Sequence, residues 1–310
     1  MPSILVQGMR SPPLSFRPRR SLLFVPGSNR RALAKARGLP ADGLIFDLED
    51  AVAPAAKDDA RVAITEAIRE GGFGRRELVL RVNPFATRWG EADLATAAKL
   101  PIDAVLLPKI ESADQVHRAV SHLDALGAPS ELAVWCMLET PRGILAAAEI
   151  AAASPRIAAL VAGTSDLTKD LHALDTPDRA PMMTALGLLL LAARAHGLIA
   201  LDGVHLALDD DKGFAFVCRQ GRALGFDGKT LIHPGQIEPA NAAFAPSPGE
   251  ISLSQRIIAA HAEAETRGAG VVLVDGRLIE NLHVDNARRT LAIAAAITQI
   301  EAENARTEEN

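Results

Sequence analysis

The stretch Glu131–Asp170, ELAVWCMLETPRGILAAAEIAAASPRIAALVAGTSDLTKD, contains two apolar runs that are each closed by an acid. Glu139 closes the first run just before a Pro-Arg-Gly turn, and Asp166 closes the second just after a Gly-Thr-Ser turn. The Ala-rich segment between the runs is typical of a helix. In an α/β protein such a helix carries the chain back before the next parallel strand begins. Both carboxylates are therefore expected at the same end of neighbouring strands.

The same unit of apolar run, polar turn and amphipathic segment recurs along the chain from Ser21. The eight runs are SLLFVPG, GLIFDLED, ELVLRVN, AVLLPKI, LAVWCMLE, IAALVAGTSD, LIALDGVHL and FDGKTLIHP. Helical patterns lie between them, for example over residues 57–70, 113–126, 182–196 and 211–224. Eight alternating units in about 210 residues predict a (β/α)8 TIM barrel rather than an open doubly wound sheet.

Three segments are expected along the chain. The first twenty residues contain four Arg and no acid, and residues 1–18 are expected to be a flexible N-terminal extension, with a transit peptide as the alternative. Residues 19–234 hold the eight units of the barrel. Residues 235–310 begin with a Pro-rich link and continue with helical patterns, so we expect a C-terminal helical extension that covers the barrel mouth or reaches a neighbouring subunit.

The composition narrows the class of protein. The 310 residues are 48% hydrophobic and 23% charged, as in ordinary globular proteins. With 33 Lys and Arg against 38 Asp and Glu the net charge is −5, and no basic stripe suggests nucleic acid as a partner. No apolar run approaches the roughly 18 to 20 residues of a membrane span. Cys136 and Cys218 lack CxxC spacing and are expected to be buried free thiols in a reducing compartment, so we expect a cytoplasmic protein.

Four further charged residues are expected at the mouth with the two acids of the opening stretch. A period of two places Asp47 and Glu49 on one face of GLIFDLED and Arg81 on the corresponding face of ELVLRVN. Lys109 ends the fourth run. Barrel enzymes have their active sites at the C-terminal ends of the strands, which is where all these residues fall.

Glu139 and Asp166 are the candidate metal ligands. Carboxylates gathered at one mouth repel each other, and desolvating each costs several kcal/mol unless a cation compensates. Oxygen ligands without histidine or thiolate suit Mg²⁺, Mn²⁺ or Ca²⁺ rather than Zn²⁺. The alternative is that both acids are helix N-caps or salt-bridge partners, because both precede helical segments.

The other charged residues are candidates for binding or catalysis, and most of them have a structural alternative. Asp47 and Glu49 either orient metal-bound water or pair with basic side chains. Arg81 offers a planar fork for a substrate carboxylate, or pairs with these acids, or does both. Arg20, near the turn PGSNRR, is a candidate for phosphate binding. For Lys109 a structural role is an equal alternative to a functional one.

Eight motifs together carry a resemblance to a known family. PRRSLLFVPGSN, FDLEDAV, LRVNP, LLPKIE, ETPRGI, GTSDLTKDL, GFDGKTLIHPGQI and GRLIENLHVDNARR occur in this order between about residues 19 and 302. They resemble the citrate lyase β-subunit-like branch of the HpcH/HpaI aldolase family. The resemblance implies a (β/α)8 barrel that forms a homotrimer or hexamer. It also implies cleavage of the CoA thioester of a 3-hydroxy-carboxylic acid with Mg²⁺, or Mn²⁺ as the alternative ion.

The resemblance also implies roles for individual residues. Glu139 and Asp166 match the metal ligands of the family, and Arg81 matches the arginine that holds the oxo acid. Asp47 and Glu49 match acids that lie behind the metal.

Two further residues are implied for the CoA part of the substrate, and one for proton transfer. Arg20 matches a basic residue near the CoA phosphates, and Lys109 is assigned to CoA binding with it. In several family members a C-terminal carboxylate, often Asp in an I-D-x-P sequence, crosses to a neighbouring subunit as acid or base. Here the sequence is Ile279-Glu280-Asn281-Leu282, so the acid is Glu280 and the proline is absent.

These features predict a Mg²⁺-dependent carbon–carbon lyase. The expected substrate is of the citryl-, malyl- or citramalyl-CoA type, and the products are acetyl-CoA or propionyl-CoA and an oxo acid. One alternative keeps the site but hydrolyses a malyl-CoA-type thioester. The other is a citrate lyase β subunit that needs a carrier partner for activity.

Overall fold

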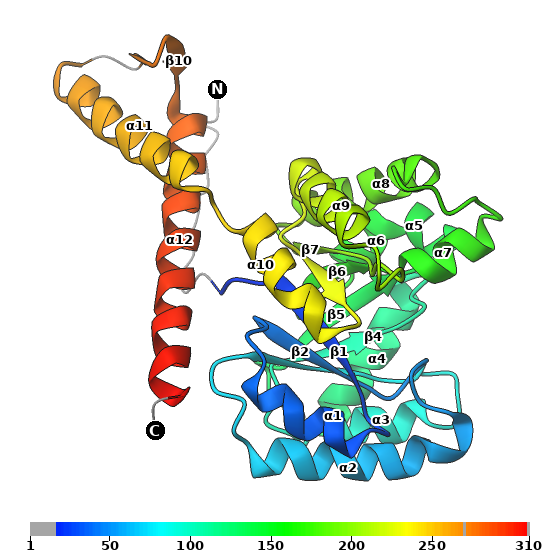
Figure 1. The fold of residues 1–310 in the computed structure, drawn as a ribbon. Coiled ribbons are helices and arrows are strands. Elements are labelled where there is room, and N and C mark those ends of the chain that lie inside the picture. Colours follow the sequence, from blue (N-terminus) through cyan, green and yellow to red (C-terminus); the bar gives the residue numbers. More distant parts are fainter. Residues whose placement is uncertain (1–16, 269–270, 309–310) are drawn as a thin grey trace. The chain divides into compact units, whose positions relative to one another are not determined.

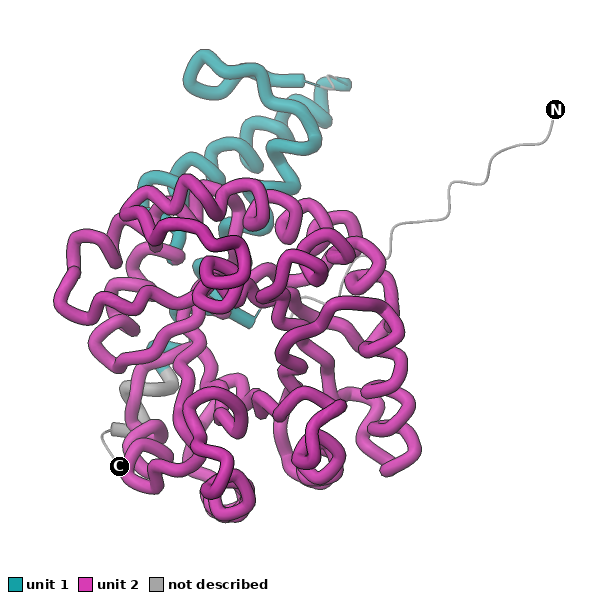
Figure 2. The backbone as a smooth tube through the Cα atoms, turned by 90° about the vertical axis from the view of Figure 1, so that its right-hand side faces the viewer, with its two compact units in different colours: residues 1–18, 245–310 teal, residues 19–244 magenta. Residues whose placement is uncertain are grey.

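The computed structural model describes residues 17–268 and 271–308. It divides into two compact units, of which the larger is Arg19–Phe244 and the smaller contains the C-terminal residues from Ala245. Figure 2 shows the two units in different colours. The predicted N-terminal extension over residues 1–18 lies, apart from its last two residues, outside the described part of the chain.

The larger unit is a closed barrel of eight parallel strands in sequence order, which confirms the predicted (β/α)8 TIM barrel (Figure 1). The pairing of β1 with β8 closes the barrel, with Ser21 opposite Lys229. The strands are β1 (Ser21–Pro26), β2 (Gly43–Asp47), β3 (Glu77–Arg81), β4 (Ala104–Leu107), β5 (Ala133–Leu138), β6 (Ile157–Ala162), β7 (Ile199–Asp202) and β8 (Gly228–Leu231).

Helices follow the strands and surround the barrel (Figure 1). They are α1 (Arg30–Lys35), α2 (Lys57–Glu70), α3 (Gly90–Ala97), α4 (Ala113–Ala125), α5 (Pro141–Leu145), α6 (Ala147–Ala152), α7 (Thr164–Asp170), α8 (Met183–Ala195), α9 (Asp211–Leu224) and α10 (Ile237–Phe244). The barrel unit therefore extends to Phe244 and includes α10, which the prediction assigned to the extension.

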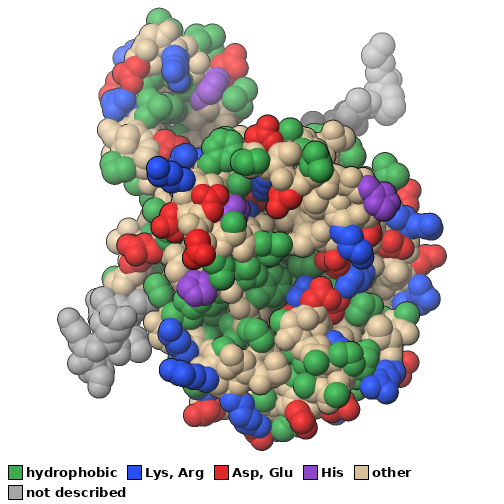
Figure 3. Space-filling view, turned by 45° about the vertical axis from the view of Figure 1, so that its right-hand side comes forward, with side chains coloured by type: hydrophobic (Ala, Val, Ile, Leu, Met, Phe, Trp, Pro, Cys, Tyr) green, Lys and Arg blue, Asp and Glu red, His purple; other side chains and the backbone are tan. Residues whose placement is uncertain are grey.

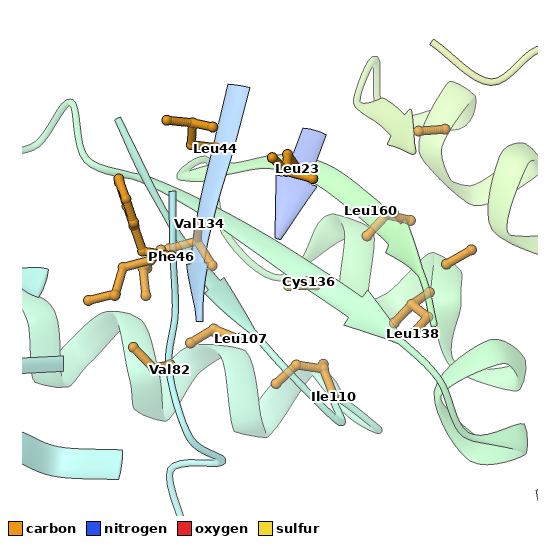
Figure 4. Packing of buried hydrophobic residues seen from close by; sticks show 14 of the residues in the cluster. Leu23, Leu44, Phe46, Val82, Leu107, Ile110, Val134, Cys136, Leu138 and Leu160 are labelled. Atoms are coloured by element: carbon orange, nitrogen blue, oxygen red, sulfur yellow. The ribbon is translucent and has the colours of Figure 1, made fainter. Parts of the chain in front are cut away.

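Two hydrophobic clusters show which way each strand residue points. The larger cluster joins strand residues such as Leu44 and Phe46 to helix residues such as Ile64, so it lies between the strands and the helices (Figure 4). The smaller cluster contains only strand residues, among them Ile45 and Val79, and fills the barrel interior. Because side chains alternate along a strand, the interior positions of these two residues direct Asp47 and Arg81 toward the barrel axis as well.

The two cysteines belong to the outer layer of the barrel. Cys136 and Cys218 are buried free thiols, as predicted, and both lie in the larger hydrophobic cluster. Burial raises the pKa of the Cys136 thiol to about 12. A thiol with such a pKa stays protonated near neutral pH and is a poor nucleophile, so Cys136 contributes to packing.

The C-terminal unit has its own small core. It contains α11 (Pro248–Thr266), the antiparallel pair β9 (Val272–Val274) and β10 (Arg277–Ile279), and α12 (Asn281–Glu308). A capping box between Ser247 and Glu250 fixes the start of α11. The core residues are Ile257, Val274, Ile279, Val284 and Ala287.

Two surface properties of the described residues concern charge and hydropathy. Acidic and basic side chains are interspersed on the face shown in Figure 3, without a broad field of one sign. Within residues 17–268 and 271–308, no helix combines the length and the apolar character that crossing a membrane requires.

Candidate active site at the barrel mouth

Glu139 follows β5 and is 3% exposed at the C-terminal end of the barrel. Its Oε1 accepts a hydrogen bond of 2.7 Å from the backbone N–H of Lys109, which follows β4. On the other side it lies against Gly163, which follows β6: a β-carbon at Gly163 would be 2.2 Å from Glu139 Cβ and 2.6 Å from Oε2. The carboxylate is therefore held between two neighbouring strand ends, and only a glycine at position 163 leaves room for it.

Asp166 lies in the first turn of α7, and its side chain is 30% exposed. A carboxylate there is favoured by the free N–H groups of the helix start. Lys109 Nζ is 3.5 Å from Asp166 Oδ2, so Lys109 contacts both Asp166 and Glu139. The structure thus brings the two acids of the opening stretch to one place, as the strand order predicted.

The N-cap part of the structural alternative for the two acids is wrong, whereas its salt-bridge part holds for Asp166, which pairs with Lys109 over 3.5 Å. The N-cap of α5 is Thr140, whose side chain accepts a hydrogen bond of 3.1 Å from the backbone N–H of Gly143. The N-cap of α7 is Gly163. Glu139 therefore remains available for another partner, and Asp166 is inside the helix rather than at its cap.

Arg81 is bound by Asp47 through two parallel hydrogen bonds. Nε donates to Asp47 Oδ1 over 2.7 Å, and one terminal nitrogen donates to Oδ2 over 2.6 Å. The other terminal nitrogen is 3.2 Å from Glu49 Oε2, and the guanidinium lies 4.6 Å above the ring of Phe24. The predicted pairing of Arg81 with these acids is thereby confirmed, and Arg81 keeps N–H groups for a further acceptor because a guanidinium has five.

Asp47 and Glu49 are themselves fixed by the loop that follows β2. Asp47 is fully buried and accepts hydrogen bonds from the backbone N–H groups of Glu49 and Ala51, over 2.8 and 3.1 Å. The buried Lys57 ammonium donates to the carbonyl oxygens of Leu48 and Glu49, over 2.9 Å each. This lysine pairs with the loop backbone and not with the two carboxylates.

The acids of the mouth influence one another electrostatically. Desolvation, together with the negative charge of Glu49, raises the pKa of Glu139 to about 8. Burial also raises the pKa of Glu49, despite the nearby Arg81 and Lys109. Desolvation lowers the pKa of Lys109, but the hydrogen bond and charge of Glu49 outweigh it and raise that pKa overall. Glu139 is therefore a buried carboxyl whose ionised form an additional cation would stabilise.

The pair Glu139 and Asp166 fits a Mg²⁺ site with incomplete protein ligation. No set of three His, Cys, Asp or Glu side chains in the described ranges 17–268 and 271–308 is grouped to hold a metal ion. Mg²⁺ is commonly bound by one or two carboxylates and completes its octahedron with water and substrate oxygens. The position of Glu139, which the absence of a side chain at Gly163 permits, and the raised pKa of this buried carboxyl both fit a cation bound to its carboxylate.

Arg20 is not at the mouth, and the prediction that it contacts the CoA phosphates is not supported by its position. It immediately precedes β1, which puts it at the N-terminal end of the barrel, opposite the mouth. Its side chain is 4% exposed and donates two hydrogen bonds of 2.9 Å to Asp42, which immediately precedes β2. The physical reason is that a residue before a parallel strand lies at the opposite end of the sheet from a residue after it.

Glu280 belongs to the C-terminal unit, between β10 and α12, and is exposed. Its backbone N–H donates a hydrogen bond of 3.0 Å to His283 Nδ1. Its proposed contribution to an active site stays a prediction.

The structure adds Asp50 and Gly163 to the residues found from the sequence. Asp50 Oδ1 lies 3.4 Å from Lys109 Nζ, and its side chain is 57% exposed. Its position directly after Glu49 in the FDLEDAV motif was a usable signal. Gly163 carried no such signal, because its importance arises from contact with a neighbouring strand end. The predicted residues that meet at the mouth are Asp47, Glu49, Arg81, Lys109, Glu139 and Asp166.

A cavity of about 500 Å³ opens beside Lys109, between the loops that follow β3 and β4 and helices α3 and α4. Phe85 and Pro108 contribute apolar surface, Arg88 and Arg118 contribute positive charge, and Glu91 contributes one negative charge. The cavity is large enough for part of an extended ligand that reaches the mouth.

Comparison with known proteins identifies relatives along nearly the whole chain. The family model described as HpcH/HpaI aldolase/citrate lyase matches residues 20–234. A (3S)-malyl-CoA thioesterase of Cereibacter sphaeroides is 51% identical over 286 residues, which cover 92% of this chain and 98% of the relative. The citrate lyase subunit beta of Leuconostoc mesenteroides subsp. cremoris is 37% identical over 290 residues, with coverage of 92% and 96%.

Solved structures show the same fold. The crystal structure of the protein CitE from Mycobacterium tuberculosis, in complex with magnesium, acetoacetate and coenzyme A, is similar with a TM-score of 0.73 and 32% identity. The similarity covers 91% of this chain and 99% of that one. RipC from Yersinia pestis is 31% identical with a TM-score of 0.64, over 75% of this chain and 97% of that one.

Proposed function

The chain belongs to the HpcH/HpaI aldolase/citrate lyase family, and on this basis we propose that it is a Mg²⁺-dependent thioesterase acting on (3S)-malyl-CoA or a closely related 3-hydroxy-carboxyacyl-CoA. The observation that carries the proposal is the buried carboxylate of Glu139 beside Asp166, at a mouth that also presents Arg81. Identity of 51% with a (3S)-malyl-CoA thioesterase supports hydrolysis over the carbon–carbon cleavage that the motifs alone suggested.

Glu139 and Asp166 would hold the cation and leave its remaining positions to water and substrate oxygens. When bound, the cation supplies Lewis acidity to a substrate oxygen and neutralises the two carboxylates. Gly163 and the backbone N–H of Lys109 hold Glu139 in place from opposite sides, so this ligand is positioned before the substrate arrives.

Arg81 would bind the carboxylate of the acyl group. Its two hydrogen bonds to Asp47 and its stacking on Phe24 fix the plane of the guanidinium. The N–H groups that these contacts leave free can pair with an incoming carboxylate, for which arginine is well suited. Asp47 is then a positioning residue, because it acts on the substrate only through Arg81.

Hydrolysis joins the oxygen of a water molecule to the thioester carbon and breaks the carbon–sulfur bond. One proton of the water must be taken up by a base and finally reach the CoA sulfur, which leaves as a thiol. Glu280 is our candidate for this base, in place of the role of protonating an enolate that a lyase would require. We propose that it acts at the mouth of a neighbouring copy of the chain.

The cavity beside Lys109 is the candidate location for the CoA arm. Its apolar wall at Phe85 suits the pantetheine chain, and Arg88 and Arg118 suit phosphate groups. This assignment replaces Arg20, which lies at the other end of the barrel, and keeps Lys109 at the junction of cavity and mouth.

A carbon–carbon lyase is the second candidate. It is supported by the 37% identity with a citrate lyase subunit beta, and by a structural relative that binds magnesium, acetoacetate and coenzyme A. Such a lyase would either cleave a CoA ester by itself or be active only together with a carrier partner.

Product analysis distinguishes these functions. The purified chain is incubated with (3S)-malyl-CoA, citramalyl-CoA and citryl-CoA, and the products are separated by chromatography. Free CoA and the hydroxy acid are expected from a thioesterase, whereas acetyl-CoA and an oxo acid would identify a lyase. Absence of turnover on every ester without a carrier would contradict both activities of the isolated chain.

A further inference from the structure

Lys109 contacts four carboxylates of the mouth at once. Its backbone N–H donates to Glu139 over 2.7 Å, and its ammonium group donates to Glu49 over 2.5 Å. The same ammonium lies 3.4 Å from Asp50 and 3.5 Å from Asp166. One residue therefore orients one candidate metal ligand and partly neutralises the other.

The backbone of Lys109 is adapted to this double task. Its φ is 53°, in the left-handed region that a residue with a β-carbon rarely adopts. Such conformations persist where the surrounding structure imposes them, often at functional sites. In this conformation Lys109 donates its N–H to Glu139 and still extends its side chain to acids that follow β2 and β6.

A divalent cation would share these carboxylates with the ammonium group. A Mg²⁺ ion held by Asp166 would be in direct contact with this carboxylate, and Lys109 Nζ is 3.5 Å from Oδ2 of the same carboxylate. The two positive charges would repel each other at such short range, and the half-buried mouth would screen them weakly. Lys109 and the cation therefore compete for the same negative charge.

We propose that Lys109 is an internal counter-ion, which stabilises the acidic mouth in the absence of metal and weakens the binding of a divalent cation to Glu139 and Asp166. The inference rests on the proposed metal site. It assigns to Lys109 a task in setting metal affinity, different from the CoA contact that the sequence suggested. Arg81 contributes differently, because its guanidinium is held by Asp47 and Glu49.

The test is calorimetric titration of the metal-stripped protein with Mn²⁺ as the probe. Lys109→Met removes the charge and keeps the stem and the backbone N–H, whereas Lys109→Arg keeps the charge. Lys99→Met, at an exposed position after α3, is the matched control for loss of one positive charge. We expect Lys109→Met to bind Mn²⁺ at least tenfold more tightly than the wild type, and the other two variants to stay within about threefold.

A second measurement uses only the wild-type protein. Acetylation of lysines with acetic anhydride, read by peptide mass spectrometry, reports how accessible the Lys109 amine is. We expect Mn²⁺ to increase the labelling of Lys109 at least threefold relative to Lys99, because the cation displaces the ammonium from its carboxylates. Equal or decreased labelling would contradict the displacement.

The outcomes separate this inference from the proposed function. If the wild type binds Mn²⁺ and Lys109→Met binds it equally or more weakly, Lys109 is not a competing counter-ion, although the metal site stands. If neither protein binds Mn²⁺, the proposed metal site and this inference both fail.

Discussion

Gly163 lies directly against the side chain of Glu139, since a β-carbon at Gly163 would come within 2.6 Å of Oε2. Its φ of −95° is accessible to any residue, so the backbone itself does not require glycine here. Gly163→Ala should therefore act only by displacing Glu139. We expect Mn²⁺ affinity and Mg²⁺-dependent turnover to fall at least tenfold, measured by calorimetry and by release of free CoA.

Gly187→Ala is the matched control for that substitution. Gly187 lies within α8, and no atom would be within 4 Å of a β-carbon there. Alanine at a helix interior is favoured over glycine by about 0.5–1 kcal/mol. Gly187→Ala should stabilise the protein slightly and leave Mn²⁺ binding unchanged. Equal effects of the two substitutions would show that the contact with Glu139 is not what requires Gly163.

The ion pair of Arg81 and Asp47 should be essential for stability. Asp47 is fully buried, and its loss leaves the Arg81 charge without its main partner. Asp47→Asn is expected to destabilise the fold by about 3–5 kcal/mol in urea denaturation. The double variant Asp47→Asn/Arg81→Met should lose less than the sum of the single variants, because it leaves no unpaired charge.

An exposed ion pair provides the comparison. Arg30 and Glu66 form a 2.6 Å contact with side chains that are 67% and 57% exposed. Glu66→Gln should change the free energy of unfolding by no more than about 0.5 kcal/mol. A similar loss of unfolding free energy in Asp47→Asn and Glu66→Gln would mean that the buried ion pair stabilises the fold no more than the exposed pair does.

The stability of the metal-free protein should decrease as pH rises. Burial and the charge of Glu49 raise the pKa of Glu139 to about 8, whereas a glutamate in an unfolded chain titrates near 4.3. Between these values the folded protein keeps a proton that the unfolded chain has released. The contribution of Glu139 is therefore complete below about pH 4.3 and is lost as the pH rises through about 8.

Thermal unfolding at pH 6 and pH 9 checks this dependence. From pH 6 to pH 9, the melting temperature of the metal-free wild type should fall more than that of Glu139→Gln. The variant has no proton to release at this position. Added Mg²⁺ should recover part of the loss at pH 9 in the wild type only. Parallel pH profiles for both proteins would contradict the raised pKa.

Glu280 should affect turnover rather than substrate affinity. If it transfers a proton, Glu280→Gln should lower kcat at least a hundredfold and change KM for the CoA ester little. Glu263→Gln, an exposed substitution on α11 of the same unit, is the control and should be silent. An unchanged kcat in Glu280→Gln would contradict proton transfer by Glu280 and would leave the C-terminal unit with a structural role only.

The barrel and most of its mouth could be predicted because both follow from local rules. The apolar runs and helical periods identify eight strand–helix units, and the period of two within strands directs Asp47 and Arg81 to the barrel axis. Parallel connection then brings Glu139 and Asp166 to one end of the sheet. These steps need no knowledge of how distant residues pack.

Two predictions from the sequence differ from the structure. Arg20 was assigned to the CoA phosphates from the family resemblance and the nearby PGSNRR turn, although a residue that precedes a strand lies at the opposite end of the barrel. The Pro-rich link after residue 234 was taken as the start of an extension, yet it forms α10. Pro239 falls in the first turn of this helix, where a missing N–H breaks no helical hydrogen bond.

Other features depend on contacts between strand ends that no local pattern encodes. The closeness of Gly163 to Glu139, and the reach of Lys109 to three further acids, arise only when β4, β5 and β6 are side by side in the barrel. The sequence motifs also do not distinguish hydrolysis from carbon–carbon cleavage, because both reactions use the same charged residues.

The most direct test of the account is Mg²⁺-dependent release of free CoA from (3S)-malyl-CoA, followed with a thiol reagent during titration of the metal-stripped enzyme with Mg²⁺. The account predicts that CoA release requires Mg²⁺ and that Glu139→Gln and Asp166→Asn each abolish it while keeping a wild-type circular dichroism spectrum. Release of CoA at the same rate without Mg²⁺, or unchanged rates in both variants, would contradict the account.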